Sequence, residues 1–138
     1  MSNYYHLNVY KSSYKLLVEI YTSLKNLSKE YKYTIGEKVK EKAFDILVNI
    51  YKANKTKEKV VYLDNALDDT EFIRLSLRLL RDLNILNDRK FILLNEIVED
   101  VFLQFEKWKS YELCQKRWMA TCHPFLSHYR FHKHIVQN

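Results

Sequence analysis

The sequence predicts an all-α protein, and three observations carry that prediction. The chain has 138 residues, 47% of them hydrophobic, which is enough apolar material for the core of one domain. It contains one glycine, Gly36, and one proline, Pro124. A β-sandwich or barrel needs a turn roughly every 8–12 residues, usually built on Gly, Pro, Asn or Asp. Apolar residues instead recur at helical spacing along most of the chain.

The first two predicted helices follow each other closely. The first covers roughly residues 10–31, and the second is expected to begin with a capping box in which Thr34 caps and Glu37 returns the bond to the Thr34 amide. Asn54-Lys55-Thr56 ends the second helix. The second helix has two apolar edges, which suggests that it contacts other parts of the protein on both sides. The apolar positions are Tyr14, Leu17, Val18, Tyr21, Leu24, Leu27 and Tyr31 in the first helix, and Val39, Ala43, Phe44, Ile46, Leu47, Val48, Ile50 and Tyr51 in the second.

The third and fourth predicted helices carry the clearest apolar stripes. The third covers roughly residues 57–86 and has a heptad seam, and Asn87-Asp88 stops it and caps the fourth helix. Because short connections between long helices make neighbours antiparallel, we expect an up-down-up-down four-helix bundle over residues 1–112. The stripes are Leu63, Ala66, Thr70, Ile73, Leu77 and Leu80 in the third helix, and Leu94, Val98, Val101, Phe105 and Trp108, widened by Leu93 and Ile97, in the fourth.

Charge is distributed unevenly between the bundle and the C-terminal extension. All 17 acidic residues lie in residues 1–112, together with 19 of the 23 lysines and arginines. Residues 113–138 contain four bases and no acid, so they supply most of the net charge of +6. Four of the five histidines are there as well. The sequence therefore predicts a basic, aromatic, His-rich extension after the bundle.

Targeting signals and several ligand motifs are missing from the sequence. No apolar run approaches the roughly 18 residues of a membrane span, and the N-terminus lacks the features of a signal peptide. Two cysteines are too few for a disulfide framework, and one glycine excludes Gly-rich phosphate loops. We expect a cytoplasmic protein with no membrane partner.

Three arginines of the third helix are the first candidates for binding. Arg74, Arg78 and Arg81 lie at i, i+4 and i+7, on one helical face, and guanidinium groups bind phosphates bidentately. The alternative is ion pairing, because Glu71 precedes Arg74 and Asp82 follows Arg78 at helical spacing. A second basic set at both ends of the second helix is interpreted as an ordinary solvated surface: Lys38, Lys40, Lys42, Lys55, Lys57 and Lys59.

The C-terminal extension supplies the second group of candidates. Basic side chains track phosphates while aromatic rings stack on unpaired bases, which is the chemistry of single-strand binding. Binding to nucleic acid or a polymerase is favoured here over an interface with another protein or a tail that covers the bundle. The candidate residues are Lys116, Arg117, Trp118, Tyr129, Arg130 and Lys133.

Metal binding and catalysis have little support in the sequence. His128 and His132 lie at i, i+4 and Cys122 can add a thiolate, but no CxxC pair and no fourth ligand accompany them, so solvated histidines are favoured. The acids Asp64, Asp68, Asp69 and Glu71 are interpreted as capping and solvating the third helix, since no Glu-x-x-His motif of di-iron bundles occurs. We predict no cofactor and no enzyme.

Several segments together resemble the Avd-like four-helix-bundle family, whose name comes from the accessory variability determinant of diversity-generating retroelements. Tyr33-Thr34-Ile35-Gly36-Glu37, with Ala43 and Asn54, resembles the ends of that family's second helix. The stretch from Glu71 to Leu83, with two arginines four apart, resembles the third helix, and Asn87 to Trp108 resembles the fourth. The likeness covers about residues 10–110. One departure is that Val101, Phe102 and Phe105 stand where the family usually has a glycine or two.

The resemblance implies a function as well as a fold. It implies a homopentameric barrel with a basic ring that engages a reverse transcriptase and template RNA or cDNA, and that supports mutagenic copying without catalysing it. Arg74 and Arg78 match the arginine pair implicated in partner engagement in the family. Bundle proteins encoded in ribosomal RNA intervening sequences share the architecture, but the Pro-Ser-Asn-type break of their second helix is absent. A ribosomal-RNA-associated or protein-adaptor bundle without a polymerase partner is the alternative.

Overall fold

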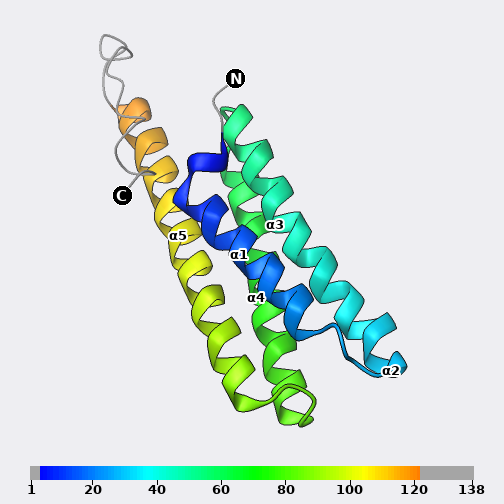
Figure 1. Cartoon of the computed structure of the whole chain (residues 1–138). Helices are drawn as coiled ribbons and strands as arrows, with labels where there is room; N and C mark the ends of the chain where they lie inside the picture. The colour runs from blue at the N-terminus through cyan, green and yellow to red at the C-terminus, as the bar shows by residue number, and fades with distance from the viewer. Residues whose placement is uncertain (1–3, 122–138) are drawn as a thin grey trace.

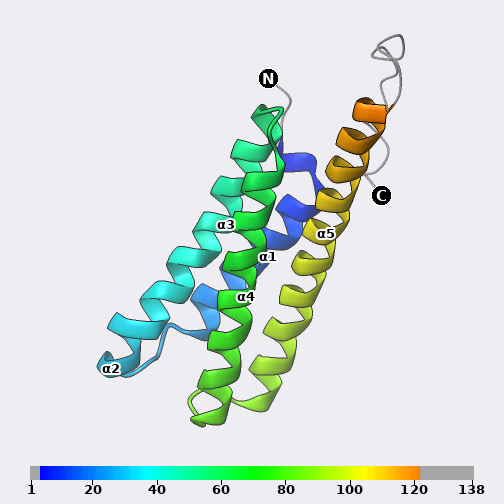
Figure 2. The ribbon, with the colours of Figure 1, turned by 180° about the vertical axis from the view of Figure 1, so that it is seen from behind.

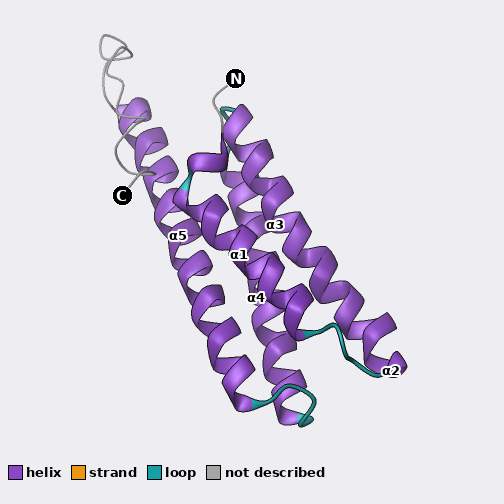
Figure 3. Cartoon of the chain, in the orientation of Figure 1, coloured by secondary structure: helices purple, strands orange, loops and turns teal. Residues whose placement is uncertain are grey.

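The computed structural model describes residues 4–121, and within this range the chain is helical and has no strand (Figure 3). Four long helices, α1, α3, α4 and α5, pack together around one apolar core. No helix in this range is long and apolar enough to cross a membrane. The elements are a 3₁₀ turn η1 (Tyr4–His6), α1 (Asn8–Ser23), α2 (Lys29–Tyr31), a π-helical turn η2 (Lys32–Gly36), α3 (Glu37–Lys55), α4 (Val60–Asp82) and α5 (Asp88–Thr121).

Each long helix has two main neighbours. Helix α1 packs on α3 and α5, and α4 also packs on α3 and α5, so the four helices enclose the core. The connection from α3 to α4 lies beside η1 and the C-terminal end of α5, at the end of the bundle that is uppermost in Figure 1. The connection from α4 to α5 lies at the opposite end (Figures 1 and 2). The two ends are called the upper end and the lower end below.

The predicted apolar seams form the core. All six seam positions of α4 are buried, and so are the five stripe positions of α5 from Leu94 to Trp108. Val101 and Phe105, which replace the small residues of the Avd-like pattern, are fully buried. The bulk of these side chains is therefore used inside the bundle. In α3 only one of the two predicted edges is covered, because Phe44 and Val48 are exposed.

The N-terminal half of the chain differs from the prediction at two points. Helix α1 ends at Ser23 instead of continuing to residue 31, and the chain becomes helical again at Lys29. The capping box at Thr34 is wrong, because an N-cap residue needs extended backbone and Thr34 already lies within the π-helical turn η2. Its hydroxyl instead donates to the Glu30 carbonyl at 2.5 Å.

Gly36 is required by a close approach in this turn. A Cβ atom at Gly36 would lie 2.9 Å from the Leu27 Cδ1 atom and 3.0 Å from the Tyr31 carbonyl oxygen. Carbon atoms in ordinary contact are about 3.5–4.0 Å apart. The single glycine of the chain therefore allows the segment before α2 to pack against the start of α3.

The helix ends on either side of the lower connection are defined by two asparagines. Helix α4 ends at Asp82 rather than near residue 86, because Asn84 adopts a left-handed conformation with φ of 60°. The Ile85 N–H donates to the Leu80 carbonyl and the Asn84 N–H to the Arg81 carbonyl, both at 2.9 Å, which is a Schellman motif. The predicted cap of the next helix is confirmed, since Asn87 Oδ1 accepts the Lys90 N–H at 2.9 Å.

Helix α5 continues well past its last buried residue. Glu112 is buried, whereas residues 113–121 are exposed apart from a half-buried Gln115. The first nine residues of the predicted extension therefore belong to α5, and Lys116, Arg117 and Trp118 lie on a regular helix.

The Schellman motif gives a prediction for stability. We expect Asn84→Gly to raise the free energy of unfolding by up to about 1 kcal/mol, because glycine adopts the left-handed conformation without a steric penalty. Asn84→Ala is expected to lower it by about 1 kcal/mol, since alanine incurs that penalty without the local polar contacts of asparagine. Urea denaturation followed by circular dichroism measures both changes. Equal stabilities of the two variants would contradict the assigned role of the left-handed residue.

Candidate nucleic-acid and partner interface

Arg74 is held between α4 and α5 by contacts within the chain. Its guanidinium forms an ion pair and a hydrogen bond with Glu71, and its Nε atom lies 2.9 Å from Glu99 Oε1 as an ion pair without hydrogen-bond alignment. The guanidinium carbon also lies 4.4 Å from the centre of the Phe102 ring. Only 18% of the side chain is exposed. The charge of Arg74 is thus compensated inside the protein, as the ion-pairing alternative predicted.

The other two arginines of this face differ from each other. Arg81 pairs with Asp82 at 3.2 Å and stacks 4.2 Å from the Phe91 ring centre. The prediction that Asp82 pairs with Arg78 is wrong, because Arg81 takes that carboxylate. Arg78 is exposed and has no ion-pair partner among residues 4–121. Of the three arginines, only Arg78 offers an uncompensated charge to a partner.

The exposed end of α5 carries the predicted mixture of basic and aromatic side chains. Lys116 Nζ lies 2.7 Å from Glu58 Oε2, and its hydrogen bond lowers the pKa of the Glu58 carboxyl. Arg117 is exposed and has no ion-pair partner in the described part of the chain. Trp118 is 45% exposed. Arg117 and Trp118 are therefore available for a phosphate and a base on neighbouring positions of one helix.

The remaining predicted site residues lie outside the described residues. They include the candidate contacts Tyr129, Arg130 and Lys133 and the candidate metal ligands Cys122, His128 and His132. Within residues 4–121, no group of three or more His, Cys, Asp or Glu side chains is arranged to hold a metal ion.

Lys59 has a structural role at the upper end that the sequence analysis missed. Its Nζ atom donates to the Ala53 carbonyl at 2.6 Å and to the Thr56 carbonyl at 2.7 Å, which satisfies the C-terminal end of α3. Burial lowers the pKa of Lys59, and the nearby Glu112 carboxylate opposes this shift. Lys59 is thus not part of a solvated surface. A lysine shortly after a helix end is the signal that predicts such a cap.

A polar pocket of about 410 Å³ lies between α3 and α4. Asp69 lies at its buried side, where it accepts a hydrogen bond from Asn49 Nδ2 at 3.3 Å and lies 3.4 Å from Lys42 Nζ. Burial raises the pKa of Asp69, while the attraction of Lys42 partly offsets that effect. The prediction that this acid is solvated is therefore wrong, whereas Asp64 forms an exposed pair with Lys109 at 2.6 Å.

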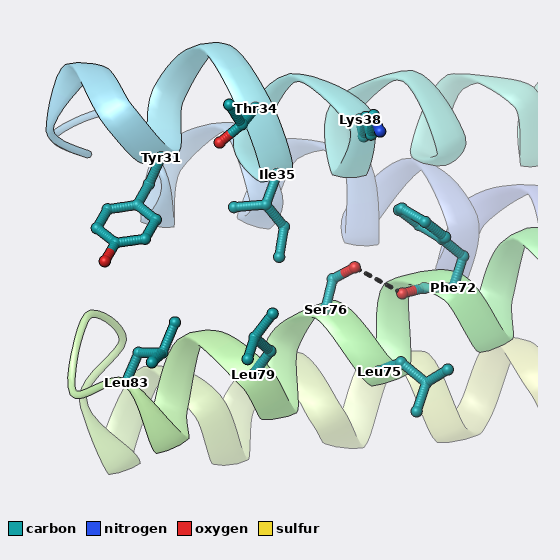
Figure 4. Close-up of a pocket in the computed structure, with 9 residues that line it drawn as sticks. All are labelled: Tyr31, Thr34, Ile35, Lys38, Phe72, Leu75, Ser76, Leu79 and Leu83. Carbon is teal, nitrogen blue, oxygen red and sulfur yellow. Dashed lines mark hydrogen bonds between the residues drawn. The ribbon is translucent and has the colours of Figure 1, made fainter.

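An apolar groove of about 480 Å³ lies near the lower end, between the start of α3 and the C-terminal half of α4. Figure 4 shows Tyr31 and Ile35 on one side of it and, on the other, two leucines of α4 and the leucine that follows the helix. The leucines lie at i, i+4 and i+8, away from the buried seam, and are exposed to solvent: Leu75, Leu79 and Leu83. A groove of this kind can hold the apolar face of a helix.

No protein-family model matches the chain, and no curated protein matches it. The resemblance to the Avd-like family rests on the segments quoted above, and its functional content stays a prediction.

The contacts of Arg74 predict a structural effect of its removal. We expect Arg74→Ala to lower the free energy of unfolding by about 1–2 kcal/mol, because two carboxylates and an aromatic ring lose their partner. Arg78→Ala is the matched control and is expected to change stability by less than about 0.5 kcal/mol, as exposed substitutions usually do. Denaturant titration of both variants measures the difference. Equal stabilities would show that the contacts of Arg74 with Glu71, Glu99 and Phe102 contribute nothing to stability.

The raised pKa of Asp69 predicts a pH dependence. Because the folded chain holds this proton more tightly than the unfolded chain, the stability contributed by Asp69 is present below its ordinary pKa of 3.8 and is lost as the pH rises through the raised folded pKa. The ionised carboxylate thus disfavours folding at neutral pH. We expect Asp69→Asn to be more stable than the wild type at pH 7 and to lose this advantage at low pH. Thermal unfolding across the acidic range tests this, and a destabilised variant at pH 7 would show that the Lys42 pair outweighs burial.

Proposed function

We propose that this chain is a non-catalytic accessory protein of a diversity-generating retroelement, which binds reverse transcriptase and template RNA or cDNA in the cytoplasm. The observation that carries the proposal is the exposed C-terminal part of α5, where Arg117 is uncompensated and Trp118 is half exposed. The resemblance of residues 10–110 to the Avd-like family supports the choice of partner.

The chemistry of binding follows from these side chains. A guanidinium neutralises a phosphate and releases counterions, and an indole ring stacks on an unpaired base. The net charge of +6 adds a long-range attraction for a polyanion. Arg78 supplies a further exposed guanidinium on α4, while Arg74 keeps the face rigid rather than contacting the partner.

The proposed assembly is a homopentamer of antiparallel, up-down-up-down bundles. Two different exposed apolar surfaces support assembly, namely the groove beside Leu75 and Leu79 and the uncovered edge of α3 at Phe44 and Val48. Two unlike surfaces on one subunit permit head-to-tail contacts that close into a ring. A ring repeats each uncompensated arginine around one opening and so concentrates positive potential there.

A protein-adaptor bundle without a polymerase partner is the second candidate. The apolar groove favours it, because a helix-binding groove needs no nucleic acid to function. The two functions differ in how the binding affinity depends on salt concentration. Affinity from phosphate contacts falls steeply as the salt concentration rises, whereas affinity from apolar docking does not.

Replacing the two uncompensated arginines tests the proposed function. We expect Arg78→Ala combined with Arg117→Ala to weaken binding of a fluorescein-labelled oligouridylate by about tenfold at low salt. We also expect the slope of the logarithm of the binding constant against the logarithm of the salt concentration to become smaller in magnitude by about one to two. Fluorescence anisotropy measures both effects, and co-purification with the reverse transcriptase of a diversity-generating retroelement tests the second partner.

The matched control removes the same charge from arginine and lysine side chains that are already paired. Arg81→Ala combined with Lys116→Ala is expected to retain most of the affinity, because both cations are compensated by Asp82 and Glu58. If the two double variants bind the oligonucleotide equally, the proposal that Arg78 and Arg117 contact nucleic acid is wrong. If the wild type binds neither oligonucleotide nor polymerase and is a monomer by native mass spectrometry, the accessory function is wrong and the adaptor function remains.

A further inference from the structure

Tyrosine rings form a connected row on the outer side of the contact between α1 and α3. The Tyr4 ring stacks on Tyr5 with centroids 4.5 Å apart, and both contact Tyr10, at 5.4 and 5.1 Å. Tyr10 continues the row to Tyr14 at 6.2 Å, and Tyr4 connects it across to Tyr51 of α3 at 5.6 Å. These five residues are called the tyrosine stripe. They come from η1, α1 and α3, which lie side by side at the upper end in Figures 1 and 2.

The stripe is only partly used by the fold. Tyr4 and Tyr10 pack against the core and hold η1 in place. Tyr5 and Tyr14 are 55% and 51% exposed, so each presents a large ring surface to solvent. Half-exposed aromatic rings in contact with each other form a surface on which further planar rings can stack.

Lysines accompany the aromatic rings on the same surface. Lys55 Nζ lies 4.6 Å from the centre of the Tyr51 ring, at one end of the stripe. Farther along α1, beyond Tyr14, Lys40 Nζ lies 4.9 Å from the Tyr21 ring, which also contacts Phe44 at 6.0 Å. Neither lysine has an acidic partner among residues 4–121. Cations therefore border the aromatic surface at two points.

We infer that the tyrosine stripe binds single-stranded nucleic acid, with bases stacked on Tyr5 and Tyr14 and a phosphate neutralised by Lys55. Stacking of bases on aromatic rings beside a basic track is how proteins bind single strands without sequence preference. The inference rests on the proposed function and adds a second contact surface to it. The stripe begins at the same end of the bundle as Arg117 and Trp118, so one strand can contact both surfaces.

A second copy of the chain is the competing occupant, and the composition of the stripe favours nucleic acid. Tyrosine is enriched in both kinds of interface, but lysine is depleted from protein interfaces and is the usual phosphate contact. The apolar groove near the lower end has a different character, because four of its nine lining side chains are aliphatic and only one is a lysine. That groove fits a protein partner better than the stripe does.

The test replaces single exposed tyrosines in the full-length chain. We expect Tyr5→Ala and Tyr14→Ala each to weaken binding of labelled oligouridylate and oligothymidylate by about tenfold, since one stacked base contributes a factor of roughly five or more. Tyr14→Phe keeps the ring and is expected to bind as the wild type does. Tyr33→Ala is the matched control, because Tyr33 is 63% exposed and lies in η2, away from the stripe. Fluorescence anisotropy gives the affinities, and circular dichroism verifies that each variant is folded.

The outcomes separate this inference from the proposed function. A loss confined to the Tyr5 and Tyr14 alanine variants supports the stripe as the binding surface. If these variants bind as the wild type does while the double variant of Arg78 and Arg117 binds the oligonucleotide more weakly, the inference that the tyrosine stripe binds nucleic acid is wrong and the proposed function stands. If native mass spectrometry shows that Tyr14→Ala loses subunits at unchanged affinity, the stripe is a subunit interface and the inference is wrong. If the wild type binds no oligonucleotide, both proposals fail.

Discussion

The buried seam of α4 is the contact on which the rest of the structure depends. Helix α4 packs on both α3 and α5, and its six seam side chains occupy the centre of the core. Burial of a large apolar side chain contributes about 1.5–3 kcal/mol. Four of the six seam residues are large and apolar, and all four are fully buried: Leu63, Ile73, Leu77 and Leu80. The seam also fixes the rotation of α4 about its axis. That rotation directs Arg74 toward α5 and leaves Arg78 in solvent, so the core determines which cations remain uncompensated.

Much of the fold could be predicted because its determinants are periodic. The seams of α4 and α5 and the cap at Asn87 follow from spacing and local chemistry, and all are found in the structure. The break after Ser23 and the π-helical turn could not be predicted, because the apolar spacing continues without interruption at Leu24, Leu27 and Tyr31. A capping-box pattern at Thr34 has no effect where the chain is already helical.

The candidate site was harder to predict than the fold, because charge compensation is a tertiary property. Arg74 and Arg78 look alike in the sequence, yet Glu99, which is 25 residues away along the chain, pairs only with Arg74. Lys59 likewise resembles a surface lysine until the carbonyls at the end of α3 are placed around it. The tyrosines of η1, α1 and α3 share no sequence motif and meet only when the bundle forms.

The pair between Glu58 and Lys116 has a consequence for orientation. Successive residues of an α-helix point about 100° apart around its axis, so fixing the direction of one side chain fixes those of its neighbours. The buried residues of α5, up to Glu112, set the azimuth of Arg117 and Trp118 through the continuous helix. Because Glu58 belongs to the connection before α4, the pair with Lys116 joins the exposed end of α5 to the rest of the bundle and helps to hold that orientation. Exposed ion pairs add little to stability and are screened by salt. Ionic strength therefore acts on this surface in two ways: it screens the attraction for a polyanion, and it loosens the pair that joins the last turns of α5 to the bundle.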